Sequence, residues 1–247
     1  KDIFDMKNLP DSMTIIGAGA IGVEFAYFFN AFGVKITLIE AQDFLLPNED
    51  EEISQWMYKV FKRKKINIQT GIIADSIQDD HILVSIGVEG NSLGLGLDKI
   101  GVTLGENNHI AVNENGQTNI ENIYAVGDVI GPPWLAHVSA AEGLYVAEHI
   151  ANLSPKKIDY NCIPACTYSK PEVASIGMTK KQLDKKGIVY NTAKSFFNSN
   201  GKAVATGATD GFIKIYIGND NLILGAHIIG SNATEMISEF SLAMRNQ

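Results

Sequence analysis

One stretch near the N-terminus, SMTIIGAGAIGVEFAYFFNAFGVKITLIEAQ, constrains the fold more than any other part of the chain. It opens with a short apolar strand at residues 14–16, and Gly17, Gly19 and Gly22 follow in the pattern G-x-G-x-x-G. The apolar segment VEFAYFFNAF predicts a buried helix that ends at Gly33, and KITLIE predicts a returning strand. Strand, glycine turn, helix and strand in this order predict a βαβ unit of a doubly wound α/β sheet that binds a dinucleotide.

Each glycine of this turn has a separate expected role. Gly17 permits the tight turn, Gly19 lets the backbone approach a pyrophosphate, and Gly22 lets the helix pack closely on the strand. The helix N-terminus supplies free N–H donors to the phosphates. Glu40, at the end of the returning strand, is expected to accept hydrogen bonds from both hydroxyls of the adenosine ribose. No Arg or Lys follows it closely to neutralise a 2′-phosphate, so the sequence predicts NAD rather than NADP.

The next segments continue the alternation of helices and strands. Residues 49–65 predict a second helix, INIQT predicts a strand, and DDHILVSIG predicts a further strand that ends at Gly87. The connection between these two strands is short for a doubly wound half-sheet. We therefore expect a segment that usually lies between Ile73 and His81 to be missing.

The middle of the chain predicts a second ligand-binding edge. Residues 123–126 predict an apolar strand closed by Gly127 and Asp128, and a helix of small and apolar residues then runs to Leu153. A carboxylate at the C-terminal end of a strand, beside a helix N-terminus, lies where open α/β sheets bind ligands. The Gly-Asp pair is equally compatible with an ordinary turn, and His137 alone is more typical of a polar residue at the start of a helix.

The last part of the chain, residues 155–247, has a different pattern. Short runs rich in Val, Ile, Tyr and Phe alternate with turns, and GNDN at residues 218–221 predicts a hairpin. Two helices, TKKQLDKKG and NATEMISEFSLAMRNQ, lie among and after these strands. The pattern predicts a mainly antiparallel sheet flanked by helices, as a separate α+β domain.

Composition and charge argue against several classes of function. The 247 residues are 45% hydrophobic with a net charge of −8, and no apolar run is long enough to cross a membrane. The one basic run, KRKK, ends a predicted helix, where cations complement the dipole, so a nucleic-acid partner is not expected. The polar start KDIFDMKNLPDS lacks the features of a signal or transit peptide. Two cysteines form no disulfide framework, which favours a reducing compartment.

The only two cysteines, Cys162 and Cys166, lie close together in NCIPACTY and raise the question of a redox or metal role. On a strand, residues four apart point to the same face at about 13 Å, which is too far for a disulfide. We expect both to be buried apolar side chains, and we expect no metal site.

Several motifs together resemble the pyridine nucleotide–disulfide oxidoreductases. They are IIGAGAIGVEFA with LIE, then LVSIG, TNIENIYAVGD, LAHVSAAEG, YSKPEVASIGMT and GFIKIYIGNDNLILGAHIIGSNATEMI, in the order of the family and over nearly the whole chain. The resemblance is closest to the branch that oxidises dihydrolipoamide. It implies a Rossmann-like NAD-binding domain at 1–104, the second part of the FAD-binding and central region at 105–154, and an α+β dimerisation domain at 155–247.

The resemblance also implies a role for each cofactor-binding position. Contacts to the pyrophosphate and nicotinamide end of NAD are implied for Gly17, Ala18, Gly19, Ala20, Ile21, Gly22, Val23 and Glu24. Glu40 is implied to hold the ribose, Ile72 to line the adenine site, and Gly87 to approach NAD by its backbone. Asp128 is implied to accept hydrogen bonds from the ribityl chain of FAD. Main-chain contacts to the flavin are implied for Trp134, which stands where the family often has Met, and for Leu135, Ala136 and His137.

Parts of the family's catalytic machinery do not occur in this sequence. It has no C-x-x-x-x-C redox pair, since Cys162 and Cys166 have three residues between them, and no FAD-binding G-x-G-x-x-G or His-Pro dipeptide. Val88 stands where the family commonly has Arg. We therefore expect no catalytic residue in this chain, and we expect a fragment that binds NAD without turnover.

Cofactors, partners and compartment follow from the same resemblance. The implied cofactors are NAD and FAD, with oxidation of dihydrolipoamide by a disulfide, electron transfer to FAD and hydride transfer to NAD. The implied partners are dihydrolipoamide or the lipoyl domain of a 2-oxo acid dehydrogenase complex, and a second copy of the chain in a homodimer. The implied compartment is the bacterial cytoplasm or the mitochondrial matrix. Two alternatives stay open: a flavin disulfide reductase of the mercuric reductase type, and a stand-alone module that binds NAD and dimerises.

Overall fold

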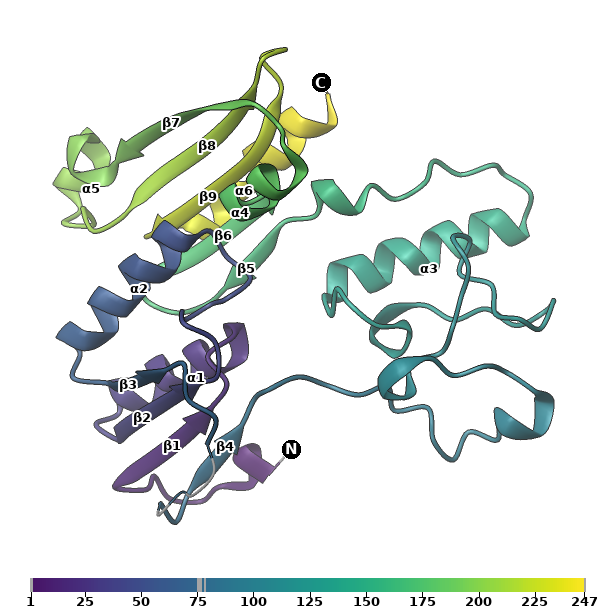
Figure 1. Cartoon of the computed structure of the whole chain (residues 1–247), viewed down its shortest axis with the longest axis horizontal. Coiled ribbons are helices and arrows are strands. Elements are labelled where there is room, and N and C mark those ends of the chain that lie inside the picture. The colour runs from purple at the N-terminus through teal and green to yellow at the C-terminus, as the bar shows by residue number, and fades with distance from the viewer. Residues whose placement is uncertain (1, 75–76, 78, 247) are drawn as a thin grey trace. The chain divides into compact units, whose positions relative to one another are not determined.

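The computed structural model describes residues 2–74, 77 and 79–246. The chain forms two compact units (Figure 1). The first combines the chain up to Ile86 with the chain from Asn161 onward, and the second is Gly87–Tyr160. The shortening expected between Ile73 and His81 falls partly on residues 75, 76 and 78, outside the described residues, and stays a prediction.

A parallel sheet forms the N-terminal part of the first unit. Its strands are β1 (Ser12–Ile16), β2 (Lys35–Glu40), β3 (Asn67–Thr70) and β4 (Ile82–Val84). They lie in the order β3-β2-β1-β4, with Ile15 opposite Leu38 on one side and Leu83 on the other. A 3-10 turn η1 (Asp2–Asp5) precedes the sheet, and the helices of this part are α1 (Ala20–Ala31) and α2 (Glu51–Arg63). The predicted βαβ unit is confirmed.

The sequence of α2 explains where this helix begins and ends. Asp50 precedes it, and its side chain accepts a hydrogen bond from the Glu52 backbone N–H at 3.2 Å. Acidic residues occupy the first turn and Lys62 and Arg63 the last, which matches the helix dipole at both ends. The helix α1 lacks such signals and instead buries an apolar face formed by Gly22, Val23, Ala26 and Phe29.

A five-stranded antiparallel sheet forms the C-terminal part of the first unit. Its strands are β5 (Ala165–Thr167), β6 (Glu172–Gly177), β7 (Tyr190–Phe196), β8 (Phe212–Gly218) and β9 (Ile223–Gly230), in the order β5-β6-β9-β8-β7. The accompanying helices are α4 (Lys180–Lys186), α5 (Gly201–Ala205) and α6 (Ala233–Arg245), with a 3-10 turn η6 (Phe197–Ser199). The hairpin predicted from GNDN is confirmed, with Gly218 N–H bonded to Leu222 O at 2.9 Å and Asn221 at a φ of 65°.

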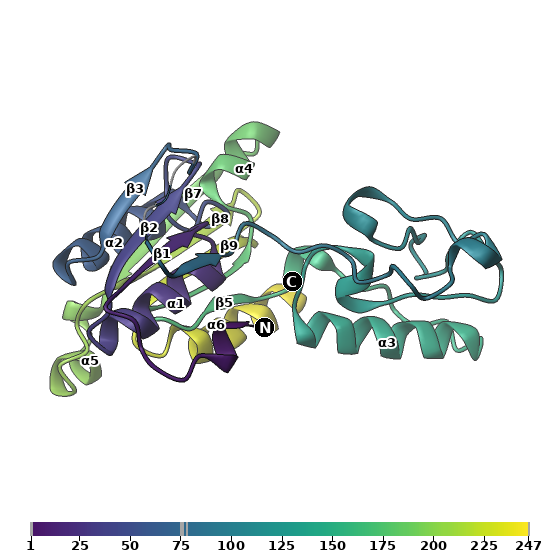
Figure 2. The ribbon, with the colours of Figure 1, turned by 90° about the horizontal axis from the view of Figure 1, so that it is seen from below.

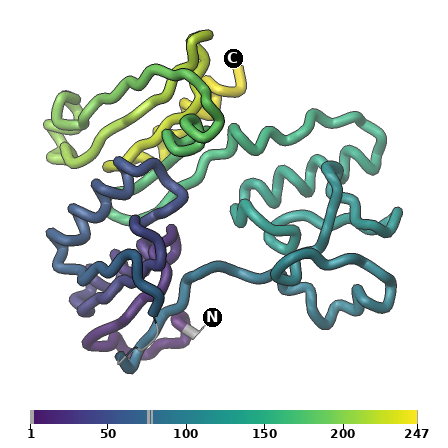
Figure 3. Tube along the Cα trace, in the orientation of Figure 1, coloured from purple at the N-terminus to yellow at the C-terminus, as the bar shows by residue number. Residues whose placement is uncertain are grey.

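The two sheets of the first unit are joined through the helices. The helix α1 contacts β1, β2 and β5, and α2 contacts β3 and β9 (Figure 2). Val173, Phe212 and Ile229 from the antiparallel sheet belong to the same buried apolar cluster as the side chains of β1, β2, α1 and α2. Segments far apart in the sequence, purple and green to yellow in Figure 3, therefore share one core.

The second unit has little regular structure besides the helix α3 (Ala136–Ile150). Its 3-10 turns are η2 (Asp98–Ile100), η3 (Glu106–Asn108) and η4 (Gly127–Ile130), and η5 (Tyr160–Cys162) follows at its end. The strand predicted at residues 123–126 is wrong. Tyr124 makes only an isolated bridge with Gln117, because the chain beside it is a short loop that offers no longer ladder.

Cys162 also lies outside the strand expected for it. It ends the 3-10 turn η5, whereas Cys166 is the middle residue of β5. Pro164 between them has no backbone N–H to donate to a ladder, so the strand begins only at Ala165.

Of the helices in the described part of the chain, none is both long and apolar enough to span a bilayer.

Candidate functional site

The glycine turn between β1 and α1 leaves one position open. Gly17 has a φ of 94°, and a Cβ there would lie 2.4 Å from the Ser85 carbonyl oxygen. A Cβ at Gly22 would lie 1.9 Å from the Gly17 oxygen, so glycine is needed for α1 to pack against the turn. A Cβ at Gly19 would meet nothing within 4 Å. Gly19 therefore borders free space at the N-terminus of α1, which has no side-chain cap and suits the pyrophosphate of a dinucleotide.

Glu40 fixes this turn from the end of β2. Its Oε2 accepts a hydrogen bond from Ala18 N–H at 2.7 Å and its Oε1 accepts one from Gln42 N–H at 2.9 Å. The residue is buried, with 7% of its surface exposed. Leu46 N–H donates to the Ala18 carbonyl at 2.8 Å, so Ala18 is held on both sides. Each carboxylate oxygen of Glu40 has a second lone pair, which leaves acceptor capacity for a ribose hydroxyl.

The remaining residues predicted for NAD fall in two places. Ala20 and Ile21 are exposed at the start of α1, whereas Val23 is buried on its inner face. Ile72 lies beside Glu40, because its N–H donates to the Glu40 carbonyl at 3.2 Å, and its side chain is exposed. Gly87 has a φ of 138° and is the first residue of the second unit. The structure thus brings the positions on α1, Glu40 and Ile72 together around one turn, and Gly87 follows Ser85 and Ile86, which border Gly17.

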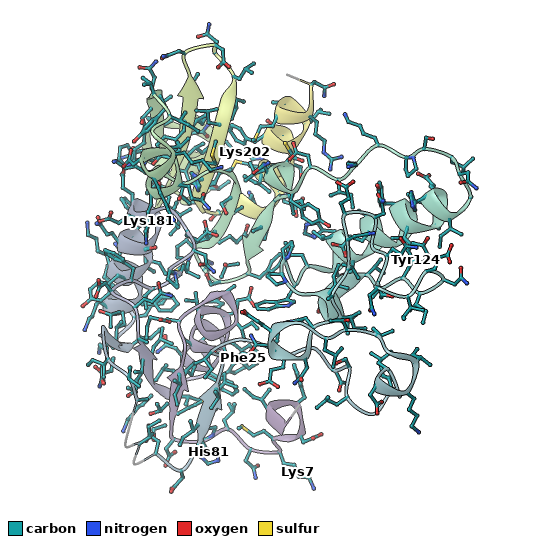
Figure 4. The ribbon with its side chains drawn as sticks, turned by 45° about the vertical axis from the view of Figure 1, so that its right-hand side comes forward. Lys7, Phe25, His81, Tyr124, Lys181 and Lys202 are labelled. Carbon is teal, nitrogen blue, oxygen red and sulfur yellow. The ribbon has the colours of Figure 1, made fainter. Side chains whose placement is uncertain are left out.

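Glu24 lies one turn further along α1, at the edge of an apolar hollow. Its Oε1 accepts a hydrogen bond from Tyr168 N–H at 2.7 Å, which ties α1 to the residue that follows β5. The hollow has a volume of about 580 Å³ and is lined mainly by aromatic side chains, among them Phe25, labelled in Figure 4, and Phe28. Glu24 is the only acidic side chain that lines it among the described residues.

The residues predicted for FAD lie in the second unit, at the start of α3 and in the turn before it. Asp128 is exposed in η4, and Trp134 is 41% exposed. Leu135 is the N-cap of α3 and provides no side-chain cap, and Ala136 and His137 begin the helix with exposed side chains. Free N–H groups and an exposed carboxylate suit the polar groups of a flavin nucleotide.

Glu142 organises this turn, and the sequence alone did not single it out. It is buried in α3, and its Oε2 accepts a hydrogen bond from Gly127 N–H at 2.7 Å. Its Oε1 accepts one from the Tyr160 hydroxyl at 2.7 Å. Burial and this bond raise the pKa of Tyr160 to about 12, so the phenol stays a donor. A Glu at the middle of the helix, with small residues on both sides of it, is the signal that could have identified it.

The two cysteines are not joined to each other in the structure, and their lack of a redox role stays a prediction. Neither is in a disulfide, and Cys162 is buried while Cys166 is half-buried. Burial, with a further effect of the nearby Glu49, raises the pKa of the Cys166 thiol and disfavours the reactive thiolate. Within the described part of the chain, no group of three or more His, Cys, Asp or Glu side chains could hold a metal ion.

Known proteins are similar to this chain over nearly its whole length, in sequence and in fold. Curated dihydrolipoyl dehydrogenases from Bacillus subtilis and Zymomonas mobilis are 41% and 37% identical to it over 98% and 95% of its length. The chain covers 56% and 55% of those two relatives, or just over half of each. The crystal structure of LpdA from Mycobacterium tuberculosis has a TM-score of 0.91 at 26% identity, covering 99% of this chain and 57% of that one.

The family models divide the sequence between them. The model for pyridine nucleotide-disulphide oxidoreductases matches residues 1–143, and the model for the dimerisation domain of the same family matches residues 163–247. The first match contains the glycine turn, Glu40 and Asp128, and it covers more than half of the chain. On this evidence, the chain belongs to the pyridine nucleotide-disulphide oxidoreductases.

Proposed function

We propose that the chain is the NAD-binding and dimerising part of a dihydrolipoyl dehydrogenase. The observation that carries this proposal is the glycine turn, in which the open position at Gly19 lies next to an uncapped helix N-terminus and to a turn fixed by Glu40. We assign residues 1–104 to the NAD-binding domain, 105–154 to the second part of the FAD-binding and central region, and 155–247 to the dimerisation domain. Proteins of this family use FAD and NAD.

The residues around the turn perform distinct tasks in binding NAD. The N–H groups at the start of α1 donate to the pyrophosphate, and Gly19 gives it room to approach. Glu40 accepts from the adenosine ribose while it holds Ala18, and Ile72 covers the adenine side. A 2′-phosphate would lie against the Glu40 carboxylate, so NAD is preferred over NADP.

The chain on its own is proposed to bind NAD without catalysing a reaction. In a protein of this fold that holds FAD and contains a redox disulfide, the disulfide and the FAD would carry electrons from a dithiol to NAD. The sequence contains no C-x-x-x-x-C pair to accept those electrons, and its own two cysteines lie in a 3-10 turn and a strand. For the whole protein we propose a lipoyl domain as partner, a second copy of the chain in a homodimer, and the cytoplasm of a bacterium as the setting, which the bacterial relatives support.

Fluorescence titration of the chain with NADH tests the binding site. We expect saturable binding, and we expect Glu40→Ala to weaken it by about tenfold or more, because it removes a charged acceptor and releases Ala18. Glu51→Ala is the matched control, since Glu51 is an exposed carboxylate on α2 that accepts a hydrogen bond from Gln55 on the same helix. Equal affinity of Glu40→Ala and the unaltered chain would contradict the ribose assignment.

An assay of NADH-linked lipoamide reduction tests the absence of turnover. The chain is expected to show no activity and no stoichiometric yellow flavin after purification. Measurable turnover, or retained flavin, would overturn the proposal that this chain only binds NAD.

A further inference from the structure

A row of polar side chains crosses the antiparallel sheet where α2 packs against it. In register, Ser175 on β6 lies opposite His227 on β9, His227 lies opposite Lys214 on β8, and Lys214 lies opposite Lys194 on β7. Three carboxylates at the start of α2 meet this row: Glu49, Asp50 and Glu52. Because α2 belongs to the parallel part, this cluster joins the proposed dinucleotide-binding part to the antiparallel sheet.

Two of the three carboxylates are paired with cations. Asp50 accepts hydrogen bonds from Lys214 Nζ at 2.9 Å and from the Tyr216 hydroxyl at 2.5 Å. Glu52 accepts from Lys214 at 2.7 Å and also from Lys194. Asp50, Lys214 and Tyr216 are at most 3% exposed, so these bonds are made in the interior.

Glu49 differs from its two neighbours. Its Oε1 accepts a hydrogen bond from Ser175 Oγ at 3.0 Å, but its Oε2 is shielded from solvent and has no hydrogen-bond partner among the described residues. When Glu49 ionises, it places an unpaired charge in the interior beside the charge of Asp50. The protonated form avoids this cost, so the packing seen here favours it.

A chain of hydrogen bonds connects Glu49 to the glycine turn. Glu49 N–H donates to the Leu46 carbonyl at 2.9 Å, and Ser54 Oγ donates to the same oxygen at 3.2 Å. Leu46 N–H donates in turn to the carbonyl of Ala18, whose N–H is held by Glu40. Leu46 has a φ of 49°, a conformation that a leucine adopts only where its surroundings impose it.

A hollow beside Glu49 gives the ionised side chain a place to turn. It has a volume of about 510 Å³, and its charged lining comprises Lys180 and Lys181, the latter labelled in Figure 4, together with Glu49 and the carboxylates of Asp43, Glu51 and Asp184. The Leu46 carbonyl is held by the backbone N–H of Glu49, and the bond to Ser175 anchors that backbone through the side chain. A carboxylate that leaves Ser175 for this hollow removes the anchor and so weakens the support for the turn at Leu46. The contact from Leu46 to Ala18 then weakens, and with it the geometry at the pyrophosphate.

We propose that Glu49 is a positioning residue that ties the glycine turn to the antiparallel sheet, and that its ionisation weakens dinucleotide binding. The inference rests on the proposed binding of NAD at the glycine turn. Binding and protonation are linked, so the dinucleotide in turn favours the protonated form of Glu49.

Several charged and titratable groups surround Glu49. They come from α2, α4 and the strands β5 and β7 to β9: Asp50, Glu52, Lys180, Cys166, Lys194, Lys214, Tyr216 and His227. Burial opposes ionisation of Asp50 and Glu52, but their hydrogen bonds outweigh it and lower the pKa of both. Burial raises the pKa of Cys166 and Tyr216 and lowers that of His227, which favours the neutral form of each. Burial, opposed by Ser175 and reinforced by Asp50, raises the pKa of Glu49 to about 7.

Titration of the chain with NADH at pH 6.5 and pH 8.5 tests the proposal. We expect weaker binding at the higher pH, by about sixfold if binding raises the pKa of Glu49 by one unit. Glu49→Gln keeps a neutral side chain at every pH, so it is expected to bind equally at both values and as tightly as the unaltered chain at pH 6.5. Ser175→Ala removes a bond that favours the ionised form, and it is expected to move the change in affinity to higher pH.

Calorimetry in two buffers of different ionisation enthalpy provides a direct measure. The unaltered chain is expected to take up protons when it binds NADH at pH 7.5, and Glu49→Gln is expected to take up none. Glu121→Gln removes an exposed carboxylate of the second unit, outside the lining of the hollow, and is expected to behave as the unaltered chain.

Stability supplies a readout that does not depend on the ligand. A carboxyl whose pKa rises from 4.5 to about 7 on folding stabilises the fold below pH 4.5 and loses that effect as the pH rises through 7. Glu49→Gln is therefore expected to have a higher urea midpoint than the unaltered chain at pH 8.5 and the same midpoint at pH 4.5.

The outcomes separate this inference from the proposed function. Binding of NADH with the same affinity at both pH values would overturn the inference and leave the NAD site in place. No binding at either pH would overturn the proposed function and, with it, the inference.

Discussion

At the scale of single residues, Asp50 is a buried carboxylate that connects α2 to the antiparallel sheet. It caps α2 through the N–H of Glu52 and accepts hydrogen bonds from Lys214 and Tyr216 of β8. Burial disfavours its charge, but the bonds from Tyr216 and Lys214 are stronger and hold its pKa below the usual range. Asp50 is therefore a buried anion whose charge is stabilised by Lys214 and Tyr216, and it in turn neutralises the buried charge of Lys214.

Asp50→Asn is expected to lower the free energy of unfolding by about 3 kcal/mol at pH 7, because it leaves Lys214 buried with only one carboxylate. Because the pKa of Asp50 is lowered on folding, its stabilisation is present above pH 3.8 and is lost as the pH falls further. Urea denaturation from pH 7 down to pH 3 measures both effects. Asp184→Asn, which breaks an exposed pair with Lys180, is the control and is expected to change nothing measurable. A loss no larger than that of the control would contradict the role assigned to Asp50.

At the scale of elements, the parts that the sequence predicts correctly are those governed by neighbours in the chain. The glycine turn, α1 and β2 follow from spacing and apolar periodicity, and the hairpin at 218–221 follows from its turn residues. The strand expected at residues 123–126 depends on a partner that the chain does not provide there, and the turn at Cys162 depends on tertiary context. The bonds of Glu40 to Ala18 and of Glu142 to Gly127 could not be predicted, because they join residues that only the fold brings together.

The glycine turn gives a prediction that separates folding from binding. Gly22→Ala places a Cβ 1.9 Å from the Gly17 oxygen and is expected to cost about 2–4 kcal/mol of stability, since α1 must shift. Gly19→Ala meets nothing within 4 Å and has ordinary backbone angles, with a φ of −69°, so it is expected to fold with near-normal stability. Its methyl group would lie where we propose that the pyrophosphate approaches, so its affinity for NADH is expected to fall at least about tenfold.

Urea denaturation and NADH titration of both glycine variants provide the check. Gly22→Ala is expected to lose stability, whereas Gly19→Ala is expected to fold normally and to lose affinity for NADH. Normal NADH affinity in Gly19→Ala would show that the dinucleotide does not approach the turn at this position.

At the scale of the whole molecule, the segment matched by the dimerisation-domain model, residues 163–247, includes α6 and the antiparallel sheet. The inner face of α6 packs on β6 and β9 through Ala233 and Ile237. Its outer face carries Leu242, which is 67% exposed. An exposed leucine on the helix of a dimerisation segment is expected to be covered by the second copy.

Light scattering of the chain is expected to give a mass twice its 26.8 kDa. Leu242→Glu is expected to shift the equilibrium to the monomer, because a charge at a packed two-fold interface is desolvated and meets its own copy. Leu144→Glu is the matched control, since Leu144 is 62% exposed on α3 and lies outside residues 163–247. If only Leu242→Glu dissociates the dimer, the interface includes the outer face of α6, whereas a dimer that survives this change must use other surfaces of the chain.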